Sequence, residues 1–284
     1  MNAKNYHKRF SLMKQIFYGF LALCVGLSAC SSSPDTVPVG KQRVFRITQA
    51  DSAGRMFSQI WTKPRLESLG AQEILSEYFD RAMHRDETHF SAVAFSRLLQ
   101  EFKLIRGEDA VLLNCFDDYQ GVLPLQDILR YDLRLATKIK LSFGSRKPDW
   151  LNPLLILVPD GKHPPFQEQF MTANIREIKF VRLNDYYAPL KEMAGTSVDA
   201  LMGFEAFKDN CLFCHSLMGK GGNKGVRLLD VYDFSVESGR IRMREDFNDF
   251  HDEDNDQDIK QFVTARQLKG IVTYLKKFAA KVVA

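Results

Sequence analysis

The chain has 284 residues, of which 45% are hydrophobic and 26% are charged, and its formal net charge is +4. Four basic residues near the start supply this whole excess, so the rest of the chain is close to neutral. These residues are Lys4, Lys8, Arg9 and Lys14. Nucleic-acid-binding surfaces carry clustered basic residues, often beside aromatic ones, and the sequence therefore predicts no nucleic-acid partner.

The first 29 residues predict a lipoprotein signal peptide. A mostly apolar run over residues 16–27 follows the basic start, and it is shorter than the roughly 20 residues that a membrane span needs. The sequence Leu27-Ser28-Ala29-Cys30 resembles the lipobox of bacterial lipoproteins, which implies cleavage before Cys30 and a lipid on its thiol. The alternative is an ordinary secretory signal in which Cys30 has no special role.

Residues 30–42 predict a flexible tether, because Ser31-Ser32-Ser33-Pro34 follows the lipid-bearing cysteine. Serine rather than aspartate after that cysteine resembles the sorting preference for the outer membrane. We therefore expect a protein of the bacterial periplasm that a lipid on Cys30 anchors to a membrane, with the outer membrane favoured.

Residues 43–192 mix short strands and helices. Residues 111–113 and 154–158 are short apolar runs bounded by polar or turn residues, as in buried strands. Residues 95–99 have the pattern of the end of an amphipathic helix. Residues 175–183 alternate apolar and charged side chains, as in a half-exposed strand.

The order of these elements resembles the molybdopterin-binding domain of the sulfite oxidase type, in its short form. The similar stretches are residues 95–99, Asp117-Asp118-Tyr119 followed by Leu123-Pro124-Leu125, and residues 153–159. The resemblance implies a compact α+β domain, in which a cysteine on an early loop would bind molybdenum. The one cysteine here, Cys115, lies on a predicted strand. We interpret it as a buried small hydrophobic residue and predict that the domain holds no molybdopterin.

A second domain over residues 193–284 is predicted from a small polar break at residues 193–196, since roughly 100 to 200 residues per domain suggests two. Ser197 is a predicted helix N-cap. Apolar residues then recur on one helix face, at Ala200, Phe204, Phe207 and Cys211. Thr264 and Gln267 predict a capping box for the last helix, whose apolar stripe runs from Leu268 to Val282.

The segment Cys211-Leu212-Phe213-Cys214-His215 predicts covalent attachment of a c-type haem. Its two thiols can form thioethers with the porphyrin, and its histidine can place a nitrogen on the iron. A zinc site would need a second Cys/His pair, which does not follow at suitable spacing. A thioredoxin-like redox pair would lie early in a βαβ unit, not late in a helical region.

Residues from about 197 onward resemble a class I cytochrome c. The similarity lies in the C-x-x-C-H segment, in Tyr274-Leu275 near the end, and in a set of glycines after the histidine. These glycines are Gly219, Gly221, Gly222 and Gly225. The similarity also lies in Gly203 with Phe207, which match the pattern by which the first helix of that family crosses the last. The resemblance implies an all-α domain with one haem c, which follows the α+β domain. It also implies Gly-Pro-x-Leu after the histidine, where this chain has Val226 in place of proline.

The sixth iron ligand is left open by the sequence. The family's methionine position is occupied by Ile259, which cannot bind iron. Met243 and His251 are the candidates nearby, Met218 lies too close to the motif, and a haem with five ligands is the third alternative. An acidic run over residues 245–258 is expected to be a solvated loop.

Together these patterns predict a membrane-tethered periplasmic monohaem cytochrome that transfers electrons to or from a redox partner protein or oxidoreductase subunit. It is expected to be an electron-transfer protein rather than a catalyst. Two alternatives remain: a molybdopterin-dependent oxidoreductase with a haem relay, and a haem-based sensor or small-ligand-binding protein. With Cys30, Cys211 and Cys214 modified, Cys115 is left without a partner for a structural disulfide in the mature chain.

Overall fold

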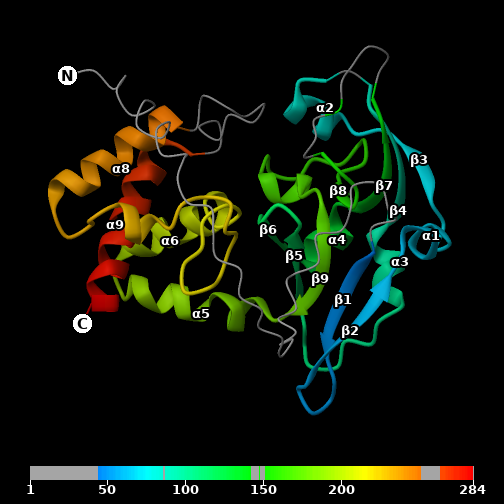
Figure 1. The fold of residues 1–284 in the computed structure, drawn as a ribbon, viewed down its shortest axis with the longest axis horizontal. Coiled ribbons are helices and arrows are strands. Elements are labelled where there is room, and N and C mark those ends of the chain that lie inside the picture. Colours follow the sequence, from blue (N-terminus) through cyan, green and yellow to red (C-terminus); the bar gives the residue numbers. More distant parts are fainter. Residues whose placement is uncertain (1–43, 86, 142–146, 148–150, 251–262, 284) are drawn as a thin grey trace, which may run out of the picture. The chain divides into compact units, whose positions relative to one another are not determined.

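Two β-sheets occupy the first part of the computed structural model, which describes residues 44–85, 87–141, 147, 151–250 and 263–283. The larger sheet has the strand order β2-β1-β9-β5-β6 (Figure 1). Within it, β1 and β9 run parallel and the other neighbours run antiparallel. Its strands are β1 (Phe45–Ala50), β2 (Met56–Trp61), β5 (Ala110–Cys115), β6 (Gln120–Pro124) and β9 (Ile175–Val181).

The smaller sheet is antiparallel and has the order β3-β4-β7-β8. Its strands are β3 (Gln72–Ile74), β4 (His89–Ala94), β7 (Arg134–Lys140) and β8 (Leu155–Leu157). Short helices connect the strands of both sheets. They are α1 (Lys63–Glu67), α2 (Glu77–Met83), α3 (Phe95–Gln100), α4 (Leu125–Arg130) and the 3₁₀ helix η2 (Glu168–Met171).

Apolar side chains from both sheets are buried where the sequence predicts strands. Residues 111–113 lie in β5 and residues 155–157 lie in β8, and all of them are buried. Cys115 at the end of β5 is buried in the same core, as expected. Residues 175–181 form the predicted strand β9, which pairs with β1 on one side and β5 on the other.

The chain from residue 183 onward is helical. Its helices are α5 (Leu183–Ala194), α6 (Val198–Asn210), α7 (Leu228–Val231), α8 (Glu237–Phe250) and α9 (Ala265–Val283). Ser197 caps α6 as predicted, because its Oγ accepts a hydrogen bond from the Ala200 N–H at 3.4 Å. The predicted capping box before α9 is also present. The Thr264 N–H donates to Gln267 Oε1 at 2.9 Å, and the Gln267 N–H donates to Thr264 Oγ1 at 3.3 Å.

Helices α6 and α9 pack against each other (Figure 1), and Gly203 and Gly270 lie where their backbones meet. A Cβ atom on Gly203 would lie 1.9 Å from the carbonyl oxygen of Gly270, so the two backbones are in direct contact. One turn later, the rings of Phe207 and Tyr274 pack with their centroids 5.9 Å apart. Tyr274 also donates its hydroxyl to the carbonyl of Leu190 in α5 at 2.9 Å. The pattern at Gly203 and Phe207 is therefore a helix-crossing pattern, as predicted.

The predicted fold class, an α+β domain followed by an all-α cytochrome c domain, is wrong. Residues 42–284 form one compact unit of mixed α/β structure with two sheets. The C-terminal region is helical, but the loop after α6 is joined to the larger sheet by backbone hydrogen bonds. One of these runs from the Gln120 N–H to the Phe213 carbonyl at 3.0 Å. The predicted boundary at residue 193 lies in the last turn of α5, which ends before Gly195.

Several predictions concern residues at or beyond the limits of the described chain. The signal peptide at residues 1–29 and the tether with Cys30 at residues 30–42 lie outside it. Among the described helices, none combines the length and the apolar character that crossing a membrane requires. The described part of the acidic run, up to residue 250, lies on α8 rather than in the expected loop.

Candidate functional site

The C-x-x-C-H segment, residues 211–215, forms a hydrogen-bonded turn directly after α6. The Cys211 N–H donates to the Phe207 carbonyl at 2.8 Å, so the segment continues from the last turn of the helix. The Cys211 carbonyl then accepts from the Cys214 N–H at 3.1 Å and from the His215 N–H at 2.8 Å. These bonds form a turn and gather two thiols and one imidazole in a short loop.

The imidazole of His215 is oriented by the backbone that follows it. Its Nδ1 lies 2.7 Å from the carbonyl oxygen of Val226. Because a carbonyl only accepts hydrogen bonds, Nδ1 carries the proton of the neutral ring and the lone pair lies on Nε2. This is the tautomer that a metal bound at Nε2 requires. Val226 therefore orients the ring through its carbonyl.

Gly225 lies directly against the same ring. A Cβ atom at this position would be 2.4 Å from Cε1 and 2.5 Å from Nδ1 of His215. The Gly225 N–H also donates to the carbonyl of Cys214 at 2.8 Å. The loop therefore folds back over the imidazole, and only glycine leaves room for the ring in this position.

The turn between β5 and β6 contacts the C-x-x-C-H segment from the side of the larger sheet. Besides the bond from Gln120 to Phe213, the Asn223 N–H donates to the carbonyl of Asp118 at 2.8 Å. The rings of Tyr119 and Phe213 stack with centroids 5.0 Å apart and an interplanar angle of 28°. The loop that carries the thiols is thus held by the sheet as well as by α6.

A side-chain network supports this contact. The Gly221 N–H donates to the hydroxyl of Tyr186 in α5 at 2.8 Å and to Oε1 of Gln120 at 3.0 Å. The Tyr186 hydroxyl also donates to the same oxygen of Gln120. Burial raises the pKa of Tyr186 to about 12, so the hydroxyl keeps its proton at neutral pH. The backbone N–H of Gly221, the side-chain amide of Gln120 and the hydroxyl of Tyr186 therefore hold the loop around Gly221 in place.

Cys211 is buried in an apolar cluster, and Cys214 is partly buried. Burial, followed by the negative charge of Glu168, raises the pKa of the Cys211 thiol to about 12. The same two causes, in the same order, raise the pKa of Cys214 well above its ordinary value. Reactive redox cysteines need electropositive surroundings that favour the thiolate. These surroundings do the opposite and speak against a thioredoxin-like redox pair.

Met243 is brought into the same hydrophobic cluster as Cys211. It lies on α8 and is 5% exposed, and the cluster also contains Tyr232 and Phe234 from the preceding segment. Of the other candidates for a sixth ligand, Met218 is 57% exposed and His251 lies outside the described residues. The structure therefore places Cys211 and Met243 in one extended apolar cluster.

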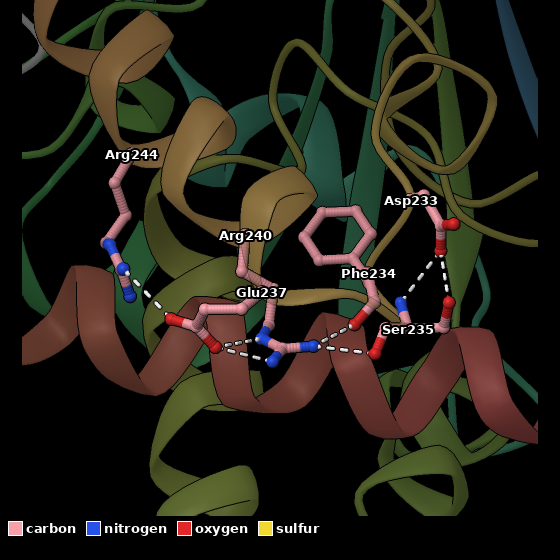
Figure 2. A network of polar contacts seen from close by, with 6 residues as sticks. All are labelled: Asp233, Phe234, Ser235, Glu237, Arg240 and Arg244. Carbon is pink, nitrogen blue, oxygen red and sulfur yellow. Dashed lines mark hydrogen bonds and ion pairs between the residues drawn. The ribbon is translucent and has the colours of Figure 1, made fainter.

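The start of α8 is fixed by a polar network (Figure 2). Arg240 donates from Nη1 to the carbonyls of Phe234 at 2.7 Å and Ser235 at 2.9 Å. Its Nε donates to Oε2 of Glu237 at 3.1 Å, and Arg244 lies 3.6 Å from the other oxygen of that carboxylate. Arg240 stands one turn before Met243, so this network sets the position from which the methionine enters the apolar cluster.

Four residues of this site were not identified from the sequence: Tyr119, Gln120, Glu168 and Tyr186. Tyr119 belongs to the Asp-Asp-Tyr stretch, which sequence reasoning connected only with a molybdopterin-binding family. The others carry no local pattern, because they lie 25 or more residues from the C-x-x-C-H segment and meet it only in the folded chain. Only their contacts with the C-x-x-C-H segment in the folded protein identify them, and no motif in the sequence does.

The residues present fit a covalently bound haem. Two thiols, a histidine whose lone pair lies on Nε2, and an apolar cluster are the groups that haem c requires. The described chain has no group of three or more His, Cys, Asp or Glu side chains that could hold a metal ion by itself.

Comparison with known proteins gives no family: no protein-family model matches this chain, and no curated protein sequence is significantly similar to it.

Proposed function

We propose that this protein is a membrane-tethered periplasmic cytochrome with one covalently bound haem c, and that it transfers electrons to or from a redox partner protein. The observation that carries the proposal is the hydrogen bond from His215 Nδ1 to the Val226 carbonyl within a C-x-x-C-H loop. It leaves the lone pair of the imidazole on the nitrogen that would coordinate iron. Sequence motif and side-chain geometry thus point to the same chemistry.

When bound, the haem supplies an iron that accepts and returns one electron at a time. Cys211 and Cys214 would hold the porphyrin through two thioethers, and His215 would coordinate the metal through Nε2. The apolar cluster around Cys211 excludes water, which disfavours the more highly charged oxidised state and raises the reduction potential. The sheet contact at Phe213 keeps the attachment loop from moving when the charge of the centre changes.

The attachment chemistry is tested by expression in a bacterial periplasm together with a haem c maturation system. We expect one haem per chain, resistant to acid-acetone extraction, in the wild type. The double variant Cys211→Ala/Cys214→Ala should carry none, whereas Cys115→Ala should carry a full complement because Cys115 lies in the sheet core. Wild-type protein without covalent haem, purified from cells that mature a control cytochrome, would refute the proposal.

The anchor is tested separately. We expect Cys30→Ser to move the protein from the membrane fraction to the soluble periplasmic fraction. Cys24→Ser, within the predicted signal, should leave the mature protein at the membrane. If Cys30→Ser and Cys24→Ser divide equally between the membrane and the soluble fraction, a lipid on Cys30 does not anchor the protein. The proposed haem chemistry would be unaffected.

A further inference from the structure

Glu168 places a carboxyl group beside the proposed attachment site. It is the first residue of η2, and its Oε2 is buried with no hydrogen-bond partner among the residues that the structure describes. After burial, its negative charge is the largest cause of the raised pKa of both Cys211 and Cys214. The carboxyl is therefore within electrostatic reach of both residues that would hold the haem.

The position of Glu168 is fixed by packing on the sheet side. The next residues of η2, Phe170 and Met171, are buried in the core of the sheet region. A Cβ atom on Gly121 of β6 would lie 2.4 Å from Oγ1 of Thr172, which directly follows η2. The segment therefore lies tightly against β6, and this packing fixes the stretch of backbone that carries Glu168.

The titratable groups that face Glu168 are the thiols of Cys211 and Cys214 and the hydroxyl of Tyr119. Once thioethers form, the two sulfurs no longer titrate. Burial raises the pKa of Tyr119 above its ordinary value, so that hydroxyl stays protonated. Lys224 is the nearby cation and acts on Cys214. Strands β6 and β8, which pack against η2, carry no titratable side chain.

Among these groups, Glu168 is the one whose protonation changes near neutral pH. Burial raises its pKa to about 7. A carboxylate with one buried oxygen that lacks a hydrogen-bond donor is costly, and a second charge change in the same region adds to that cost. If Glu168 takes up a proton when the haem takes up an electron, the net charge of the region does not change. The cost of a second charge change is then avoided.

We propose that Glu168 is a proton-linked group of the redox centre. Its carboxylate takes up one proton from solvent when the centre accepts one electron from a donor protein. It releases that proton when the electron passes to an acceptor. Charge and atoms balance in each direction, and no bond other than the carboxyl O–H forms or breaks. This inference rests on the proposed haem function.

The test is the reduction potential of the purified holoprotein, measured by spectroelectrochemistry between about pH 5 and pH 9. Because reduction takes up a proton, the wild-type potential should fall as the pH rises through neutrality. The limiting slope is about 59 mV per pH unit, the value for a tenfold change in a one-electron equilibrium. In Glu168→Gln the reduction potential should vary less with pH, because the part of the slope that comes from Glu168 is absent.

Asp117→Asn is the matched control. Asp117 also has a buried carboxylate oxygen without a hydrogen-bond partner in the described chain, and its charge acts on Tyr119 and Cys115. It is not among the causes that act on Cys211 or Cys214. We therefore expect Asp117→Asn to keep the wild-type slope, including any part that comes from the haem propionates.

Two results would overturn the inference: a wild-type potential that does not vary across neutral pH, or a Glu168→Gln variant with the wild-type slope. If Glu168→Gln does not fold, the redox-difference infrared spectrum of the wild type decides. A carboxylic acid band must appear on reduction near neutral pH, and its absence refutes the inference. If the haem is bound covalently but the slope does not depend on Glu168, this inference alone is refuted. If no haem is bound covalently, the proposed function is refuted.

Discussion

The backbone N–H of Gln120 donates a hydrogen bond to the carbonyl oxygen of Phe213 across 3.0 Å, which joins strand β6 to the middle of the C-x-x-C-H segment. Phe213 also stacks on Tyr119 from the same turn. The loop that carries the candidate haem ligands is thus supported by a β-sheet. Changes in the sheet should therefore alter the properties of the centre.

Tyr186→Phe tests this support. The substitution removes the hydroxyl that accepts from the Gly221 N–H and donates to Gln120, while Gly221 keeps its bond to Gln120. We expect the free energy of unfolding to fall by about 1 kcal/mol, the usual net value of one hydrogen bond. Urea denaturation followed by circular dichroism measures it. Tyr187→Phe is the control, because no hydrogen bond of that hydroxyl is present in the described chain. Equal losses in both variants would contradict the prediction.

Gly225→Ala tests the orientation of the imidazole. A Cβ atom would lie 2.4 Å from His215 Cε1, so the ring must turn away from the Val226 carbonyl. We expect a lower yield of haem-loaded protein and, in the loaded fraction, an altered ferrous absorption spectrum. Arg227→Ala, at an exposed position two residues later, should behave as the wild type. A Gly225→Ala spectrum and yield identical to those of Arg227→Ala would argue against His215 as the ligand.

Met243→Leu tests the sixth ligand. Leucine keeps most of the buried volume but cannot bind iron, so the variant should fold and leave one coordination position open. We expect carbon monoxide to change the absorption spectrum of the reduced variant and not that of the reduced wild type. Met202→Leu, at an exposed position of α6, should resemble the wild type. A wild type that binds carbon monoxide readily would show that Met243 does not close the site.

Glu168→Gln should change how stability depends on pH. The carboxyl has an ordinary pKa of 4.5 when unfolded and about 7 when folded, so between these values the folded state holds the extra proton. Stability therefore falls as the pH rises from 4.5 to 7, by at most about 3 kcal/mol. The uncharged glutamine avoids this loss, so the variant should be more stable than the wild type at pH 8 and equal to it near pH 4.5.

Denaturation at both pH values measures this difference. Glu73→Gln, which changes an exposed carboxyl on β3, should show no such pH-dependent gain. A Glu168→Gln variant that is less stable than the wild type at pH 8 would show that the ionised carboxylate is stabilised in the folded protein.

Local patterns in the sequence predicted local structure well. Ser197 and the Thr264–Gln267 pair form helix caps, because each cap depends only on residues three positions apart. The resemblance to class I cytochrome c implied a helix crossing at Gly203 and Phe207, and α6 does cross α9 there. The apolar stripe of α9 extends less far than predicted: Val282 is 59% exposed.

The fold class and half of the candidate site depend on contacts that no local pattern reports. The helical C-terminal region has the patterns of a separate domain, yet Phe213 and Asn223 bond to the turn between β5 and β6. Glu168 lies more than 40 residues before Cys211, and its short helix carries no feature that indicates a neighbouring thiol. Such residues become identifiable only when the chain is folded.

Covalent haem attachment is tested most directly by mass spectrometry of the proteolytic peptide that contains residues 211–215, taken from protein matured in a bacterial periplasm. We predict a peptide heavier by the mass of one haem, with Cys211 and Cys214 both protected from alkylation. A peptide of unmodified mass, in which both thiols react with the alkylating reagent, would contradict it.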